Sequence, residues 1–409
     1  MPSFINDNNS DDIPYDKPDY APNRAHVTDF DIFALLVSII SHIVDVAFDI
    51  NLAYRYYRSG KTTYFQLTLL FILFPAFVNT VISTKMYVKD EDSISVAKVA
   101  SKRWIIRIFI LIFQLAPILR YCESLGYALK SRRAEKERDY LNQRKFYDLM
   151  LKEDSDVALL RVFECFLEAA PQQVLQATIL LVGDTQAWTF QYFSQVGSVC
   201  SSLFSMGWSM ASYHRTIRFA QEDKDNISIP GTVVQFLWHF MVTVSRILSI
   251  SVAASLFPLP TTAASGIHWL VMTVWLIVTT DLVICTDSHD PMCSGRLGQF
   301  LMCSILGLVY IFTYITPEDG RTRNKYIVYY LLCVAENISA AVVWATAASP
   351  TLRAKWYFYP LLVSCIVPFG LGIGFMVLYY LYFHPSSKRG NLATLPPKNS
   401  AVQTTNGIV

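Results

Sequence analysis

The stretch WYFYPLLVSCIVPFGLGIGFMVLYYLYF, from Trp356 to Phe383, contains no charged residue. Two further charge-free runs extend from Thr62 to Thr84 and from Leu297 to Pro317. About 20 apolar residues are enough for a helix to cross the hydrocarbon core of a bilayer. Hydrocarbon cannot satisfy backbone N–H and C=O groups, so these runs are predicted to be helices rather than open strands. The sequence therefore predicts an all-α protein that crosses a membrane several times.

The composition supports this class and excludes others. Hydrophobic residues make up 53% of the chain and charged residues only 16%, whereas a soluble domain usually has about a quarter charged residues. Lys and Arg total 34 and Asp and Glu total 32, so the balance gives no sign of a nucleic-acid partner. The eight cysteines lie mostly in apolar segments and show no CxxC spacing, which is typical of small buried residues.

The chain divides into a membrane domain and two tails. Residues 1–29 are rich in Asp, Asn and Pro and are predicted to be a disordered acidic tail, and residues 384–409 a second disordered tail. The helical domain between them, 30–383, has apolar segments at 30–54, 64–84, 104–122, 157–182, 187–213, 230–256, 266–285, 297–315, 326–348 and 356–383. No apolar region of a cleavable signal peptide precedes the first segment. The charged stretch 130–154 alternates in sign, which favours a solvated helix outside the membrane.

Basic loops, which stay in the cytosol, indicate the topology. The third segment, 104–122, is flanked on both sides by basic stretches and also contains Arg107 and Arg120. An arginine held at the bilayer centre costs about 2.5–3.5 kcal/mol. This segment is therefore expected to be re-entrant or interfacial, and the basic loop 316–325 is cytosolic only if the eighth segment, 297–315, also fails to cross. About eight spanning helices remain, with both termini in the cytosol.

Two segments share a local pattern that suggests an internal duplication. The stretches LEAAPQQVLQAT (167–178) and AENISAAVVWAT (335–346) both have an acid at their second position, Glu168 or Glu336, and both end in Ala-Thr. Internal repeats are common in transport folds, but three matching positions are also compatible with chance. Both interpretations stay open.

Ionisable residues inside the predicted spans are the candidate functional residues, because they are costly in lipid and usually mark a functional path. Asp45 and Asp49 share one face of the first span, as do Glu164 and Glu168 in the fourth. The remaining candidates are Gln172, His214, Arg218, Arg246, Asp281 and Glu336. They either pair to lock helices together or form a polar lane for protons, cations, water or zwitterionic head groups. Acids outnumber the one base found at span depth, Arg246, and this excess favours the lane.

Catalytic motifs are missing from the sequence. It contains no G-x-S-x-G, no H-E-x-x-H and no Walker motif. The polar loop TDSHDP (286–291) is more typical of a solvated turn than of a metal site. We therefore expect no enzyme activity, no metal and no cofactor.

The stretch FECFLEAAPQQVLQATILL (163–181) resembles the XK-related family of membrane proteins. The acidic pair in VDVAFDINLAYRYY (44–57), the SYHRTIR ending (212–218) and VSRILSIS (244–251) are similar to that family as well, and the resemblance covers 30–383. Gln173 departs from the family, which more often has an apolar residue there. The resemblance implies ATP-independent phospholipid scrambling at the plasma membrane, which exposes phosphatidylserine on dying cells. It also implies, for some members, a single-span immunoglobulin-like partner, and for others a bridge-like lipid-transfer protein in place of scrambling.

A scramblase would use Arg218 and Arg246 to contact the phosphate and the carboxylates to hold water or the amine. Two alternatives remain: an ion or solute transporter that uses the same carboxylates, and a non-scrambling scaffold for a lipid-transfer protein. Several family members are activated by caspase cleavage of a tail. The C-terminal tail has no Asp, but Asp16-Lys17-Pro18-Asp19 has the D-x-x-D spacing, so Asp19 is the expected cleavage site. Tyr20 after the cut is unfavourable, and a plain solvated tail is the alternative.

Overall fold

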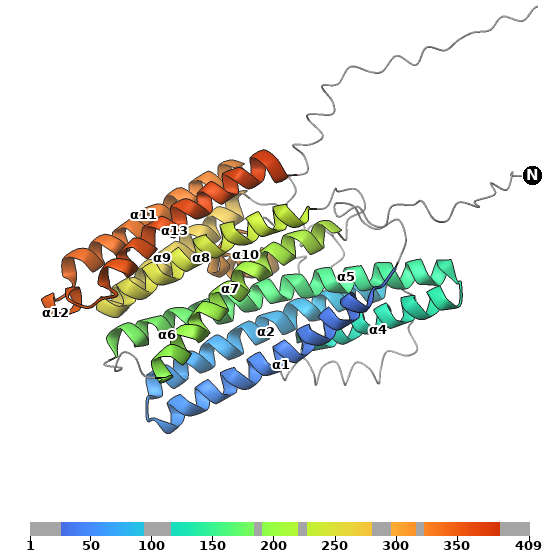
Figure 1. The fold of residues 1–409 in the computed structure, drawn as a ribbon, viewed down its shortest axis with the longest axis horizontal. Helices are drawn as coiled ribbons and strands as arrows, with labels where there is room; N and C mark the ends of the chain where they lie inside the picture. The colour runs from blue at the N-terminus through green and yellow to red at the C-terminus, as the bar shows by residue number, and fades with distance from the viewer. Residues whose placement is uncertain are drawn as a thin grey trace, which may run out of the picture.

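The computed structural model describes residues 26–93, 116–183, 190–219, 227–279, 296–315 and 323–384 (Figure 1). Every regular element within these ranges is a helix, which confirms the all-α prediction. Seven of the described helices are long and apolar enough to cross a membrane: Asp31–Arg58, Thr62–Thr84, Tyr140–Val182, Ile229–Leu256, Pro258–Thr279, Arg323–Ala347 and Phe358–Phe383. Eight spans were predicted, and the remaining one is the fifth apolar segment, 187–213. It forms α7 (Phe190–Phe219), which is long enough to cross but less apolar. Residues 1–25 and 385–409 of the two predicted tails lie outside the described residues. The first tail was predicted to extend to residue 29, but Val27 is buried and α1 begins at Asp29, so that boundary is corrected.

The first two helices form a hairpin. Helix α1 (Asp29–Arg58) begins at a capping box, in which the Thr28 hydroxyl accepts from the Asp31 N–H and the Asp31 carboxylate accepts from the Thr28 N–H. A short turn follows, with Gly60 in the left-handed region at a φ of 68°. Helix α2 (Thr62–Ser93) then returns along α1.

The charged stretch 130–154 forms parts of two helices, which corrects the prediction of a single solvated helix. Helix α4 (Ala116–Lys136) ends in a turn in which the Asp139 N–H donates to Ala134 O over 2.9 Å and Arg138 adopts a φ of 58°. Helix α5 (Tyr140–Glu164) begins directly after it, with the Asp139 carboxylate accepting from the Asn142 N–H. Hydrogen bonds from the Asn142 backbone and side chain lower the pKa of Asp139. Both helices therefore pack as a hairpin.

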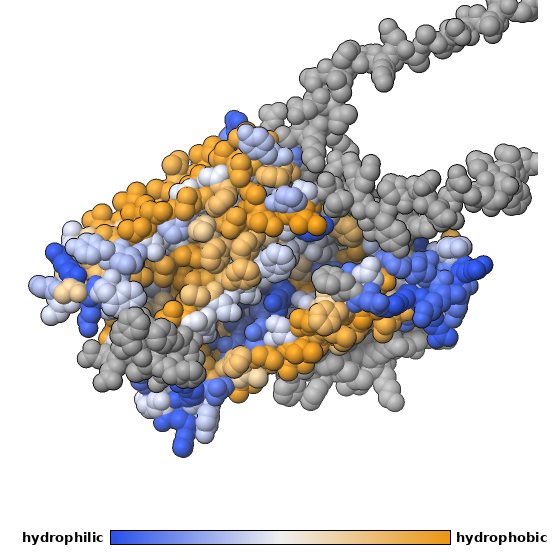
Figure 2. Space-filling view, in the orientation of Figure 1, coloured by the Kyte–Doolittle hydropathy of each residue, from blue (hydrophilic) through white to orange (hydrophobic). Residues whose placement is uncertain are grey.

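Helix α5 continues through a π-helical turn, η1 (Cys165–Ala169), into α6 (Ala170–Val182). Pro171 has no N–H to donate to the carbonyl of Leu167, and the wider turn directly before it accommodates the proline ring. The continuous helix spans 43 residues. Its length is about 65 Å, twice the roughly 30 Å of the hydrocarbon core. The apolar half lies in the membrane, and the charged half extends beyond it with α4, where Figure 2 shows a hydrophilic end.

Helix α8 (Ile229–Leu256) organises the second half of the bundle. It packs against α6, α7, α9 (Pro258–Thr279), α11 (Arg323–Ala347) and α13 (Phe358–Leu378). Helix α13 continues into a π-helical turn, η3 (Tyr379–Phe383). The short α12 (Pro350–Arg353) joins α11 to α13. Gly372 allows the close approach of α13 to α8, because a Cβ there would lie 3.1 Å from the carbonyl oxygen of Trp238.

The helix of the eighth apolar segment is shorter than a membrane span, and its re-entrant character stays a prediction. Its helix, α10 (Arg296–Val309), has only 14 residues. That corresponds to about 21 Å, which is less than the hydrocarbon core. Lys325 at the start of α11 donates to Thr279 O at the end of α9 over 3.3 Å, so the chain enters and leaves this segment at the same end of the bundle.

The third apolar segment falls largely on residues 94–115, outside the described residues. Arg120 at the start of α4 hydrogen-bonds to the Ser83 hydroxyl near the end of α2, over 3.4 Å. The two helices that flank the segment therefore meet at one end of the bundle. Its re-entrant character stays a prediction. The cost expected for Arg120 is offset, because this buried side chain pairs with Glu153 at 2.8 Å and Asp156 at 2.6 Å.

Candidate functional site

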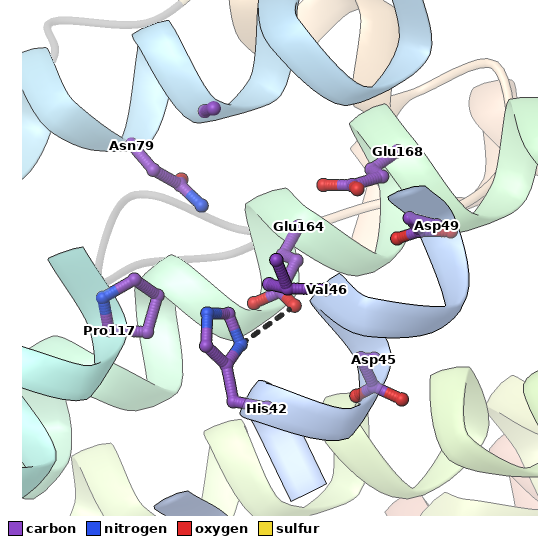
Figure 3. A pocket seen from close by; sticks show the side chains of 9 residues that line it. His42, Asp45, Val46, Asp49, Asn79, Pro117, Glu164 and Glu168 are labelled. Atoms are coloured by element: carbon purple, nitrogen blue, oxygen red, sulfur yellow. Dashed lines mark ion pairs between the residues drawn. The ribbon is translucent and has the colours of Figure 1, made fainter. Parts of the chain in front are cut away.

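The structure brings the two predicted acidic pairs together. Asp45 and Asp49 on α1 lie around the same cavity as Glu164 at the end of α5 and Glu168 in η1, and we call these four residues the acid cluster (Figure 3). The cluster lines a cavity of about 20 Å³, to which His42 also contributes. That volume holds about one water molecule. The cavity is therefore too small for a phospholipid head group in this conformation.

Specific polar contacts hold the acid cluster in place. The Gln172 side chain on α6 donates to Asp49 Oδ1 over 2.8 Å. The Asp49 and Glu168 carboxyl groups are close enough to share a hydrogen bond. The His42 Nδ1 lies 3.2 Å from Glu164 Oε1. Two ionised carboxylates cannot hydrogen-bond each other, so the Asp49–Glu168 contact requires a proton, a water molecule or a positive group.

Two basic residues of the site were missed in the sequence. The half-buried Arg161 on α5 interacts electrostatically with Glu164 and Asp45, and His42 approaches Glu164. The acid excess inferred from the sequence was therefore too large. Spacing could have identified both bases, because H-x-x-D-x-x-x-D on α1 and R-x-x-E-x-x-x-E on α5–η1 each place a base on the acidic face.

Asn79 on α2 is a further residue that the sequence did not single out. Its side chain is 4% exposed and lines the cavity of the acid cluster. The Asn79 Nδ2 donates to Leu160 O over 3.4 Å, whereas its Oδ1 has no hydrogen-bond partner among the described residues. Asn79 therefore supplies a spare acceptor beside the carboxylates.

Arg246 and Glu336 belong to a second contact network, which we call the arginine network. The Arg246 Nη2 lies 2.8 Å from Glu336 Oε2, and its Nη1 donates to Asn337 Oδ1 over 2.8 Å. The His268 Nδ1 approaches the other Glu336 oxygen at 2.7 Å. Both oxygens of Glu336 are therefore paired, and the network joins α8, α9 and α11.

The arginine network also binds the turn that follows the short helix α10. The Arg246 Nε and Nη2 donate to Ile311 O over 3.1 and 2.9 Å, and the His268 Nε2 lies 3.0 Å from Tyr310 O. Carbonyl groups of a turn beyond a helix end have no partner within the helix and must be satisfied inside the bilayer by other groups. This geometry agrees with the interpretation of these residues as locks between helices.

The remaining predicted residues lie elsewhere. The His214 ring on α7 stacks on the His239 ring of α8, with centroids 5.5 Å apart. The Arg218 Nη2 lies 3.4 Å from His384 Nε2, just after η3, which joins α7 to the C-terminal end of the membrane domain. Asp281 and Asp19 lie outside the described residues.

The fold and the acid cluster define the class of the chain: a multi-pass α-helical membrane protein with a polar site among its spans. The XK-related protein family matches residues 33–385, so the chain belongs to the XK-related family. It is 27% identical over 412 aligned residues to Cell death abnormality protein 8 of Caenorhabditis briggsae, covering 95% of this chain and 86% of that protein. It is also 27% identical over 388 residues to Cell death abnormality protein 8 of Caenorhabditis elegans, covering 91% and 82%. The resemblance inferred from residues 163–181 is confirmed.

Proposed function

We propose that this chain is a phospholipid scramblase of the plasma membrane, which moves lipids between leaflets without ATP and exposes phosphatidylserine during apoptosis. Membership of the XK-related family and similarity to two proteins named for abnormal cell death support this proposal. The observation that carries it is the acid cluster, in which four carboxyl groups from two distant segments converge at span depth.

The proposed mechanism replaces the hydration of the head group. A head group that leaves water must find polar partners, and the carboxylates of the acid cluster supply them for the amine or choline, while Arg161 suits the phosphate. The acyl tails stay in the lipid. In Figure 2 a hydrophilic patch interrupts the hydrophobic face between α1 and α7, which suits a lane open to the bilayer. Each step must bind weakly, because a deep energy well would trap the lipid.

Activation in this mechanism requires the acid cluster to open. A cavity of about 20 Å³ excludes a head group, so α1 must separate from η1 and α6. That movement breaks the Gln172–Asp49 hydrogen bond and the His42–Glu164 contact. Helix α1 is suited to this movement, because only 11% of the residues in its most apolar stretch are buried against the rest of the protein.

Purified protein in liposomes tests the proposal. Liposomes with fluorescent phospholipids in both leaflets are treated with a membrane-impermeant quencher, and the activated scramblase should make nearly all of the fluorescence accessible. Protein-free liposomes, in which only the outer leaflet is quenched, are the control. Movement of ions without movement of lipids would instead support a transporter.

A non-scrambling scaffold for a lipid-transfer protein is the second candidate. The complete pairing of Arg246 and Glu336 favours it, because fully paired charges can serve packing alone. Absence of scrambling by both the full-length and the tail-trimmed protein, together with capture of a lipid-transfer protein, would support the scaffold. A single-span immunoglobulin-like subunit is the proposed partner if the chain scrambles only in a complex.

We also propose caspase cleavage after Asp19 as the activating step. The D-x-x-D spacing of residues 16–19 and the names of the two Caenorhabditis relatives support this regulation. Cleavage would remove residues 1–19 and leave α1 and its capping box intact.

A further inference from the structure

The tip of the α4–α5 hairpin carries a positive surface that its own ion pairs leave unneutralised. Between residues 130 and 152 the chain has eight Lys or Arg and four Asp or Glu. All four acids are already engaged locally: Glu135 with His26, Glu137 with Arg133, Asp148 with Arg144, and Asp139 in the cap of α5. Lys136, Arg138 and Lys145 are exposed and form no ion pair within the described part of the chain.

Exposed apolar side chains lie among these basic residues. We call the two sets together the tip surface: Lys136, Arg138, Tyr140, Leu141 and Lys145. Tyr140 is 72% exposed and Leu141 is 87% exposed. Leu141 and Lys145 are four residues apart and so share a face of α5. Arg138 occupies the left-handed position of the turn, which glycine fills most readily. The combination of positive charge and exposed apolar groups indicates a binding surface for an acidic segment that also carries aromatic or aliphatic residues.

The beginning of the described chain is fixed beside this surface. His26 Nδ1 lies 2.8 Å from Glu135 Oε1, and Asp29 forms an ion pair with Arg132, both on the last turns of α4. Val27 is buried against the hairpin. The tail of residues 1–25 is therefore attached to the domain next to Lys136. Asp19 is within about 25 Å of His26 even for an extended chain.

Charge and composition distinguish the two tails. Residues 1–25 contain five Asp and only one Lys and one Arg, together with Phe4, Ile5, Tyr15 and Tyr20. Residues 385–409 contain Lys388, Arg389 and Lys398 and no acid. Of these two segments, only the N-terminal one complements the tip surface.

We infer that the tip surface binds the acidic N-terminal tail of the same chain, residues 1–25. Lys136, Arg138 and Lys145 pair with the tail aspartates, and Tyr140 and Leu141 pack against its aromatic and aliphatic residues. The short tether gives the tail a high effective concentration at the tip, so contacts that are weak individually suffice. A lipid surface is the poorer occupant, because the charged half of a helix of about 65 Å carries the tip away from the bilayer. This inference goes beyond lipid scrambling and does not depend on it.

Zero-length carbodiimide cross-linking of the full-length protein, followed by peptide mass spectrometry, tests the inference. The reagent joins a carboxylate to a lysine amine in direct contact. We expect tail aspartates to couple to Lys136 and Lys145 several-fold more than to Lys61 and Lys355, which lie at the opposite end of the bundle. The yield should fall at about 1 M salt, where the Debye length is about 3 Å.

A charge reversal separates binding from mere proximity of the tail. Arg138→Glu keeps both lysines, so it should lower the yield several-fold only if the tail binds through charge. Arg58→Glu, an exposed reversal at the other end of the bundle, is the matched control and should leave the yield unchanged. Yields that respond neither to Arg138→Glu nor to salt would overturn the inference, as would equal coupling to Lys61. The covalent map is read without any lipid movement, so failure of the scramblase proposal leaves it intact.

Discussion

Gln172 on α6 donates a 2.8 Å hydrogen bond to Asp49 on α1, a residue 123 positions earlier in the chain. A hydrogen bond to a charged group contributes about 1.5–3 kcal/mol. Much of α1 faces lipid, where apolar side chains gain little from packing on other helices. Polar contacts of this kind therefore hold α1 against the site.

Neutralising the acid cluster should impair lipid movement while preserving the fold. We expect Asp49→Asn and Glu168→Gln each to lower the scrambling rate at least about tenfold, a loss of roughly 1.4 kcal/mol of barrier stabilisation. Asp148→Asn, in the exposed hairpin, is the control and should leave the rate unchanged. The measurement is lipid accessibility in liposomes at equal protein incorporation. Normal rates in both cluster variants would rule out the acid cluster as the lane.

Weakening the contact between α1 and α6 should raise the scrambling rate of the protein that has not been activated. The Gln176 side chain donates to the Tyr56 hydroxyl over 2.9 Å, and Tyr56→Phe removes this bond. A neutral hydrogen bond contributes about 0.5–1.5 kcal/mol, so the open population should rise about two- to tenfold. Tyr57→Phe removes an equivalent hydroxyl from an exposed side chain and serves as the control. A Tyr56→Phe rate equal to that of Tyr57→Phe would contradict opening through α1.

The arginine network should matter for stability. Removing one partner of a buried ion pair costs about 3–5 kcal/mol, so Arg246→Met should reduce both expression and the Tm in detergent. The double variant Arg246→Met with Glu336→Gln should recover part of the loss, because it leaves no unpaired carboxylate. Arg353→Met, on the exposed α12, provides the comparison. A stable Arg246→Met protein that fails to scramble would instead place Arg246 in the lane.

The predicted topology can be tested by labelling with a membrane-impermeant thiol reagent in a background from which the native cysteines, including the exposed Cys122 and Cys200, have been removed. Probes at Lys130→Cys and Gly320→Cys should be protected in intact cells, because both positions are predicted to be cytosolic. A probe at Thr262→Cys should react, because Thr262 is exposed near the start of α9, at the opposite end of that helix from the contact with Lys325. Labelling at position 130 or 320 from outside would refute the assignment of cytosolic termini.

Proteolytic activation makes a separate prediction. An executioner caspase added to the purified protein should produce a new N-terminus at Tyr20, and lipid movement should increase after the cut. Asp19→Glu should block both effects, while Asp12→Glu, elsewhere in the tail, should block neither. An uncut tail, or a cut tail with unchanged scrambling, would leave activation to a partner or to phosphorylation.

The sequence predicted the spans and the acidic faces well, because each depends on a local physical rule. Hydrophobic length determines whether a helix can cross, and the i, i+4 spacing places Asp45 with Asp49 and Glu164 with Glu168. It did not predict which side chains from distant segments complement these acids. His268 approaches Glu336 from 68 positions away, and no local pattern connects the two.

The turn of the α4–α5 hairpin was missed for a different reason. Residues 134–142 contain neither Gly nor Pro, and the left-handed position that usually identifies such a turn is filled by Arg138. The alternating charges also continue across the turn, so both helices have the same solvated pattern.

The π-helical turn η1 determines the angular phase between α5 and α6. An α-helix rotates by about 100° per residue, and a π-turn contains one residue more than the equivalent α-turn. The side chains of α6 are thus offset by about that angle from where an unbroken α-helix would direct them. Deleting a single residue within 165–169 would rotate Gln172 out of line with Asp49 while Glu164 still faced His42. The rotation of α6 about its own axis therefore depends on a single inserted residue, and the alignment of the whole site depends on that rotation.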